Sequence, residues 1–244
     1  MSHSNLAALR GEPSYVWRAG QERRLQMVAR WAALENARVL EAGAGVGMYA
    51  SQIRRRYSPH VECFDIEFER VLEAKADTPH ALVAAAEFVP YADDIFDTII
   101  SHEVLEHVVD DRQAMQEMVR VLKPGGRLVV FVPNRWYPFE THGHYWRGQY
   151  HFGNTPLINY LPDALRNRLA PHVRAYTGRS LLRLLDGAPT RVVTHRRIYG
   201  GYDNIIARIG APAKIVRDAL HRFEGTPLDL FGLSHLLVVE KMRA

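Results

Sequence analysis

The chain has 244 residues, which is enough for one large domain or for a core domain with an added second layer. Its 47% hydrophobic and 24% charged residues are ordinary for a globular protein, and no apolar run reaches the roughly 18 to 20 residues of a membrane span. The net charge of +4 comes from scattered arginines, with no basic block interleaved with aromatic residues. We therefore expect no transmembrane segment and no nucleic-acid partner.

Two further features concern the compartment of the protein. The first fifteen residues lack the apolar region of a secretory signal. The single cysteine, Cys63, excludes an internal disulfide and suits a reducing compartment. We therefore expect a cytoplasmic protein, while the oligomeric state cannot be predicted from the sequence.

Strand patterns alternate with helical patterns through the first half of the chain. A helical pattern first covers residues 15–34. The strands expected after it are 37–43, 60–67, 80–86, 95–104 and 127–134, and the helices between them are 47–57, 69–76 and 110–122. These strands lack a polar alternate, as strands buried on both faces do. The order predicts a mostly parallel sheet with helices on both faces.

The pattern changes after Asn134. Residues 135–162 are rich in aromatic residues and histidine and show no clear period. Because unstructured loops of this length are uncommon and the segment is too aromatic for disorder, we expect a lid or a substrate wall. Regular patterns return as a helix at 177–187, a strand at 191–201, a helical stretch at 205–225 interrupted near Pro212, and a strand at 235–242.

We expect one domain over residues 1–244. Its parts would be a core at 35–134, an insert at about 135–175 and a C-terminal part at 176–244.

A glycine-rich turn follows the first strand, in the stretch RVLEAGAGVG. A P-loop needs Gly-Lys-Ser/Thr where this loop ends, but Gly47 is followed by Met48. A dinucleotide-binding turn has the spacing G-x-G-x-x-G, whereas Gly43, Gly45 and Gly47 give G-x-G-x-G. Neither phosphate-binding pattern fits, so the turn by itself does not identify the ligand.

The blocks that follow make the identification more specific. Asp65 ends the second strand about 20 residues after the turn, where an acid can bind a ribose diol. The blocks AAAEFVPYADDIFDTIISHEVLEHV and VLKPGGRLVVFVPN then follow in order. Over about residues 35–134, this set resembles the class I S-adenosylmethionine-dependent methyltransferases. Within them it looks most like the small-molecule group that contains the ubiquinone-biosynthesis O-methyltransferases.

The resemblance implies a fold, a cofactor and an activity. The fold is an α/β, doubly wound, seven-stranded and mostly parallel sheet, Rossmann-like, with a lid inserted after the fifth strand and an antiparallel last strand. The cofactor is S-adenosyl-L-methionine, and the activity is methyl transfer to a small-molecule acceptor.

The resemblance also implies cofactor-binding residues: Glu41, Gly43, Ala44, Gly45, Gly47, Asp65, Ile66, Ala86, Glu87, Ser101 and His102. Glycines let the backbone approach the amino-acid and ribose parts of the cofactor. Glu41 suits a cationic ligand, although it could instead cap the following helix. Where many relatives hold the adenine amino group with Asp, this chain has Ala85, so adenine recognition would rest on backbone groups and on Glu87.

The candidate catalytic residues are histidines: His102, His107, His142 and His144. An imidazole titrates near pH 6.5, which suits a base at neutral pH, and a base is needed only for a poorly acidic acceptor. His107 could instead fix loop geometry. The spacing Glu140-x-His142-x-His144 permits a metal site in an extended segment, but we expect these histidines to line a substrate pocket and expect no metal ion.

The aromatic residues of the insert suggest an apolar or aromatic acceptor, with O-methylation favoured, or else a small core of the lid itself. Near the amino terminus, Arg18 or Arg24 could pair with the cofactor carboxylate, although solvent exposure is the stronger expectation for either. The alternatives are a methyltransferase of RNA or protein, a non-catalytic methyltransferase-like binding subunit and a dinucleotide-dependent oxidoreductase. The sequence does not identify the acceptor or the atom that is methylated.

Overall fold

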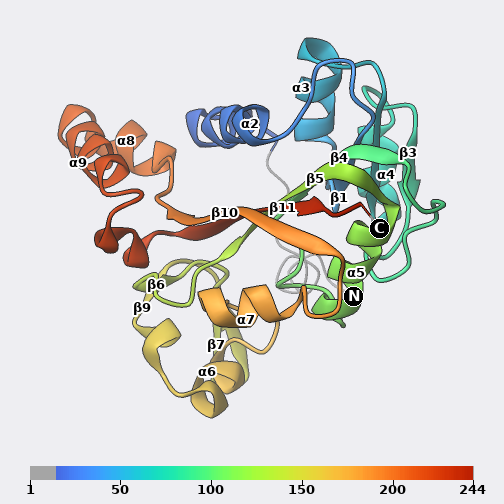
Figure 1. Ribbon diagram of the computed structural model, residues 1–244. Helices are drawn as coiled ribbons and strands as arrows, with labels where there is room; N and C mark the ends of the chain where they lie inside the picture. Colours follow the sequence, from blue (N-terminus) through green and yellow to red (C-terminus); the bar gives the residue numbers. More distant parts are fainter. Residues whose placement is uncertain (1–14, 244) are drawn as a thin grey trace.

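The computed structural model describes residues 15–243, and its centre is a seven-stranded sheet (Figure 1). The strand order is β10-β11-β5-β4-β1-β2-β3. β11 runs antiparallel to the other strands of this sheet, which are parallel to one another. The doubly wound sheet and its antiparallel last strand are therefore as expected from the sequence.

The sheet strands fall close to the predicted ranges. They are β1 (Val39–Ala42), β2 (Val61–Asp65), β3 (Ala81–Val83), β4 (Phe96–His102), β5 (Leu122–Pro133), β10 (Thr190–Ile198) and β11 (Ser234–Lys241). β4 and β5 form the centre, where the apolar residues Ile99 and Val130 are fully buried. Apolar side chains on both faces of a strand require a helical layer on each side.

The described residues form eight α-helices. They are α2 (Ala19–Trp31), α3 (Met48–Arg56), α4 (Phe68–Ala74), α5 (Asp111–Val121), α6 (Asp163–Leu169), α7 (Gly178–Arg183), α8 (Asp203–Ile209) and α9 (Ala211–Arg222). Buried residues of α2, α3 and α4 form one core with the sheet, and those of α5 and α7 form another. Figure 1 shows α8 and α9 standing apart from both layers.

The insert after β5 is folded, although its sequence shows no period. Its elements are β6 (Phe139–Glu140), β7 (His144–Trp146), β8 (Gln149–His151), β9 (Thr155–Pro156), the 3₁₀ turn η1 (Ile158–Tyr160) and α6. β6 pairs with β9, and β7 pairs with β8. A bridge between Asn134 and Tyr176 joins the two ends of the insert, so the segment leaves and rejoins the core at one point.

Several predicted boundaries were wrong. The first helix covers Ala19–Trp31 instead of residues 15–34, and α7 ends at Arg183, before Gly187. The break between α8 and α9 falls at Gly210, whose φ is +79°, while Pro212 lies in the first turn of α9, where its missing N–H costs nothing. None of the helices in the described part of the chain combines the length and hydrophobicity that a bilayer crossing requires.

Candidate active site

A cavity of about 560 Å³ opens at the carboxyl edge of the parallel strands. Its walls include residues that directly follow β1, β2, β3 and β4, namely Gly43, Ile66, Ala84 and Glu103. Ligands of doubly wound sheets bind at this edge, because the loops there diverge on either side of the sheet. The opposite wall comes from the insert, through Thr141, His142, Tyr150 and Phe152.

The glycine-rich turn forms one wall of this cavity. Gly43, Gly45 and Gly47 all have positive φ, between +55° and +77°, a region that glycine adopts without strain. A Cβ on Gly43 would lie 2.4 Å from a methyl carbon of Val104, and one on Gly47 would lie 2.9 Å from Ala74 Cβ. Gly47 is absent from the cavity wall, so its role is to let α3 pack against α4.

Asp65 lies beside this turn at the end of β2. Its Oδ2 accepts a hydrogen bond of 2.7 Å from the Gly45 amide, and its Oδ1 accepts one of 3.0 Å from the Glu67 amide. An ionised carboxylate has about four acceptor positions, so capacity for a ligand hydroxyl remains. Asp65 thus fixes the glycine turn and also lines the cavity. Its contact with a ribose stays a prediction.

Glu41 is almost completely buried and reaches α3. Its Oε2 accepts a hydrogen bond of 2.7 Å from the Ala50 amide, in the first turn of that helix. Burial, reinforced by the nearby Asp65, raises the pKa of Glu41 to about 8. The side chain therefore caps the helix and also lines the cavity, where a cationic ligand would favour its ionised form.

The segment expected to hold adenine also lies on the wall, through Ala84, Ala86 and Glu87. Oε1 of Glu87 accepts hydrogen bonds from the amides of Val109 (2.8 Å) and Asp110 (3.2 Å), which leaves acceptor capacity on the carboxylate. Glu87 thereby holds the start of α5 against this segment. Recognition of adenine by backbone groups and by Glu87 stays a prediction.

Ser101 and His102 end β4 in different environments. Ser101 is fully buried, its Oγ has no hydrogen-bond partner, and it does not line the cavity. The His102 ring lines the cavity and is stacked between Tyr49 and Phe131, at centroid distances of 3.9 and 4.6 Å. Burial lowers the pKa of His102 well below its ordinary value, so the ring is neutral at pH 7.

Two carboxylates follow β4. Arg24 Nη1 lies 2.9 Å from Glu103 Oε1, which also accepts a hydrogen bond of 3.0 Å from the Ser234 hydroxyl. Burial alone would raise the pKa of Glu103, but Arg24 holds it well below its ordinary value. Burial and the neighbouring Glu103 raise the pKa of Glu106 well above its ordinary value. Arg24 was expected to be exposed or to bind the cofactor; it is partly buried and paired with Glu103 instead.

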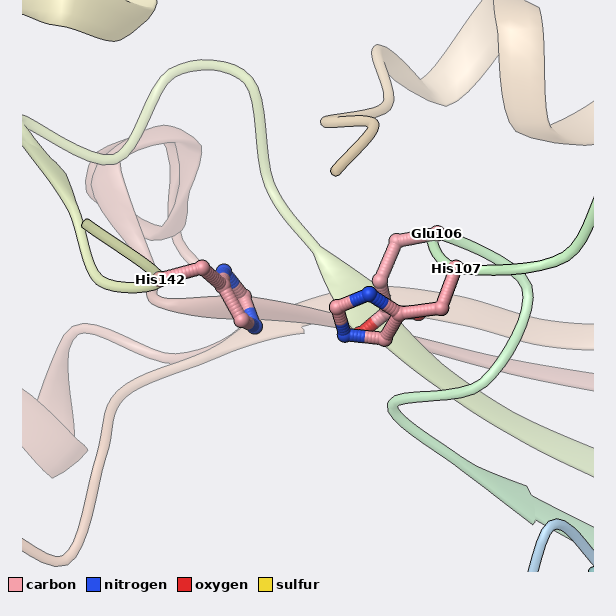
Figure 2. Close-up of side chains that lie close together, drawn as sticks. All are labelled: Glu106, His107 and His142. Atoms are coloured by element: carbon pink, nitrogen blue, oxygen red, sulfur yellow. The ribbon is translucent and has the colours of Figure 1, made fainter. Parts of the chain in front are cut away.

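His107 and His142 meet across the cavity wall. Figure 2 shows the ring of His142, from the insert, facing His107 and Glu106. The centroids of the two rings lie 5.3 Å apart. Burial and the neighbouring His142 lower the pKa of His107 to about 4. These two predicted catalytic histidines are therefore brought together at the cavity.

His144 lies elsewhere. Its Nδ1 is 2.9 Å from the Thr155 hydroxyl, its ring stacks on that of His151, and it does not line the cavity. A metal site at Glu140-x-His142-x-His144 would require an extended backbone over these residues. Gly143, whose φ is +79°, interrupts the extended backbone between the two histidines. Within residues 15–243, the cluster whose ligand atoms lie within 4.8 Å of one another is instead Glu106, His107 and His142.

Some residues of the site were not expected from the sequence. Gln21, at the start of α2, and Tyr49, in α3, line the cavity, as does Tyr150 of the insert. Glu106 was not among the predicted site residues. The LEHV stretch signalled a position after β4, but no local pattern indicated that the insert would place His142 beside it.

Comparisons with known proteins agree with this geometry. Residues 40–130 match the family model described as a methyltransferase domain. The chain is 36% identical over 111 residues to a ubiquinone/menaquinone biosynthesis C-methyltransferase, UbiE, of Geobacter sulfurreducens, covering 41% of this chain and 43% of that protein. It is 31% identical over 119 residues to a ubiquinone biosynthesis O-methyltransferase of Xylella fastidiosa, covering 46% and 48%. The chain thus spans less than half the length of these curated relatives.

A solved structure extends the likeness to the whole fold. An S-adenosylmethionine-dependent methyltransferase from Mesorhizobium loti superposes with a TM-score of 0.62 at 17% identity, covering 91% of this chain and 98% of that one. At such low identity the likeness concerns the fold.

The cavity fits the cofactor that this family implies. S-adenosylmethionine has no phosphate, and the turn has neither the lysine nor the spacing of a phosphate-binding loop. The turn brings bare backbone to the cavity at Gly43 and Gly45, and Glu41 and Asp65 place two carboxyl groups beside it. These groups would bind the ammonium and hydroxyl groups of the cofactor, which supplies the methyl group when bound. Residues 40–130 thus match a methyltransferase domain, and the chain has the fold of the class I S-adenosylmethionine-dependent methyltransferases, as expected from the sequence.

Proposed function

We propose that this protein is an S-adenosylmethionine-dependent methyltransferase of a small apolar or aromatic acceptor, with an acceptor oxygen favoured. The single observation that carries the proposal is the continuity of the cavity. The glycine turn and Asp65 line the same space as His107, which follows β4, and as His142 and Phe152 of the opposite wall. A methyl donor bound beside the glycine turn and an acceptor bound beside the insert would therefore meet within one continuous cavity.

Methyl transfer depends mainly on the alignment of the donor with the acceptor. Methyl transfer from a sulfonium is an in-line displacement, to which proximity and orientation can contribute about 7–11 kcal/mol. The acceptor side of the cavity combines the apolar side chains Val104, Val108 and Phe152 with the polar groups of His142 and Tyr150. Apolar walls would hold an aromatic ring, and a few polar groups would orient the oxygen that receives the methyl group.

His107 and His142 are the candidate bases on this side. Both are at the cavity, whereas His144 is not, so the proposal rests on the first two. The lowered pKa of His107 keeps its ring neutral at pH 7 and able to accept a hydrogen bond from an acceptor hydroxyl. Removal of the hydroxyl proton would be needed only for a weakly acidic acceptor.

Calorimetric titration with S-adenosylhomocysteine tests the donor side, with NADH as the control ligand. We expect micromolar binding of the first and no signal from the second. Transfer of a labelled methyl group is then measured on phenols, quinones and lipids, with carbon and oxygen products separated, because relatives of both kinds are similar to this chain. A folded protein that does not bind S-adenosylhomocysteine would overturn the proposal.

A further inference from the structure

A buried carboxyl group, that of Glu106, lies beside the imidazoles of His107 and His142. Glu106 is 1% exposed, and its side-chain oxygens make no hydrogen bond of normal geometry within the described residues, while the carboxyl group of Glu103 lies beside them. Nδ1 of His107 is also buried without a partner. Buried polar groups almost always have partners, because an unsatisfied donor or acceptor in the interior is costly. A ligand that contacts Glu106 and His107 together would remove this cost.

The three side chains lie close enough together to share a metal ion. One atom from each of Glu106, His107 and His142 lies within 4.8 Å of the others, and Figure 2 shows the three side chains converging. Nitrogen and oxygen ligands lie about 2.0–2.2 Å from a zinc ion, so in its tetrahedral geometry two of them are about 3.3–3.6 Å apart. The ligand atoms therefore need to approach one another by at most about 1.5 Å.

The ring of His142 is held in place by Glu140. Its Nδ1 lies 3.1 Å from Glu140 Oε1, while Glu140 Oε2 accepts a hydrogen bond of 2.8 Å from the buried Arg166. This contact leaves Nε2 of His142 for another ligand. A carboxylate on the far nitrogen is the usual support of a metal-binding histidine, because it fixes the tautomer and the ring orientation.

The cluster of Glu106, His107 and His142 is accessible from the cavity. His107 and His142 line the cavity, and Glu106 lies behind them, outside its wall. An ion held by the three side chains would keep open coordination positions on the cavity side. Three protein ligands with open positions are typical of catalytic metal sites, whereas structural zinc sites are closed by four protein ligands.

We propose that Glu106, His107 and His142 bind a divalent transition-metal ion at the acceptor end of the cavity. Two imidazoles and one carboxylate suit zinc, manganese and iron(II), whereas calcium and magnesium prefer sites made of oxygen ligands. The open positions would take an oxygen atom of the acceptor and orient it, a role that rests on the proposed function. The site replaces Glu140-x-His142-x-His144 as the metal candidate and departs from the expectation of no metal.

Zinc chloride and manganese chloride, each without cofactor or acceptor, are titrated calorimetrically into tag-free, chelator-treated protein. We expect one ion per chain for at least one of the two metals. E106Q, H107A and H142A should each weaken that binding by more than about 100-fold, since loss of even a supporting group costs about 10- to 100-fold. E140Q, which keeps the three ligands, should cost about 10- to 100-fold.

Two histidine variants serve as controls. H144A removes the histidine of the alternation motif that lies outside the cluster, and His60→Ala removes an exposed histidine. Both should bind the metal as the unchanged protein does. Each variant is also titrated with S-adenosylhomocysteine, so that a loss of metal binding is compared only among folded proteins.

The outcomes separate the two proposals. Absence of metal binding in protein that binds S-adenosylhomocysteine overturns the metal site and leaves the proposed function intact. Metal binding that survives both E106Q and H107A, or that H144A removes, also overturns it, because the ion then lies elsewhere. Metal binding without S-adenosylhomocysteine binding supports the site and overturns the function.

Discussion

The sheet core and the insert bury their polar groups in different ways. In β4 and β5 the buried side chains are mostly apolar, as Ile99, Ile100 and Val129 illustrate. The insert instead places the ion pair of Glu140 and Arg166 in its interior, each 2% exposed. The core is therefore held by apolar packing that many sequences satisfy, while the insert depends on a few specific polar contacts.

This difference bears on the site, because the cavity lies between the two regions. The core presents the glycine turn on strands that pack on both faces. The insert presents His142, whose position depends on Glu140 and, through it, on Arg166. We therefore expect changes in the insert to alter the acceptor side while sparing the sheet, and changes in the glycine turn to alter the donor side.

We expect Arg166→Met to cause the largest loss of stability. The change leaves Glu140 buried without its cation, and it also removes a hydrogen bond of 2.6 Å that Arg166 donates to the Val173 carbonyl. Removing one partner of a buried pair costs about 3–5 kcal/mol. Hydrogen exchange followed by mass spectrometry should show lost protection over residues 135–175 and retained protection in β4 and β5. Equal loss in both regions would contradict the comparison.

His235 extends the comparison to a polar group inside the sheet. Its Nε2 lies 2.9 Å from the Tyr176 carbonyl oxygen and its Nδ1 lies 3.0 Å from His195 Nε2. Burial lowers the pKa of His235 to about 4, from an ordinary value of 6.5. The unfolded chain therefore binds more protons between these values, and stability is lost as the pH falls through them.

The expected size of this loss is about 3 kcal/mol, at 1.36 kcal/mol per pKa unit. Urea unfolding at pH 7 and pH 4 measures it. In His235→Gln the decrease should be smaller by about that amount, whereas the exposed variant His60→Gln should follow the unchanged protein. Parallel curves for His235→Gln and the unchanged protein would show that His235 titrates normally.

Asp65→Ala should weaken binding of the cofactor. The change removes the acceptor of the Gly45 amide and a charge-assisted partner for a ribose hydroxyl, which contributes about 1.5–3 kcal/mol. Affinity for S-adenosylhomocysteine should fall about 10- to 100-fold by calorimetry. Asp77→Ala, which removes an exposed partner of Arg55, is the matched control and should bind normally. Equal affinities in the two variants would place the ribose elsewhere.

The smallest effect concerns Glu41. Because burial raises its pKa to about 8, much of it is protonated at pH 7, and a cationic ligand should release that proton. Affinity for S-adenosylhomocysteine should therefore rise from pH 7 to pH 8, by less than about tenfold. Calorimetry in buffers of different ionisation enthalpy counts the released protons. Glu41→Gln should abolish the release; an unchanged release would assign it to another group.

Much of the core was predictable, because each element carries a local signal. The strands predicted at 95–104 and 127–134 are found as the central strands β4 and β5. The spacing around Gly43 to Gly47 predicted a close approach of the backbone, and all three glycines have positive φ.

The insert was harder to predict for equally local reasons. The β7–β8 hairpin turns at Arg147 and Gly148, which both have positive φ. Arginine is an unusual first residue for such a turn, where asparagine or aspartate is the common signal. The strands themselves have two or three residues, too few to show a period. The sequence therefore signalled a folded, aromatic segment but none of its strands.

The sequence by itself determined the strand and helix order of the core, the glycine turn and the acid at Asp65, because these depend on periodicity and on backbone conformations that few residues allow. Only the tertiary structure decided which histidines share a site. His107 and His142 are 35 positions apart, and their meeting depends on how the insert folds back from Asn134 to Tyr176. Contacts between side chains so far apart in the chain leave no local pattern, since they are set by the packing of whole elements against one another.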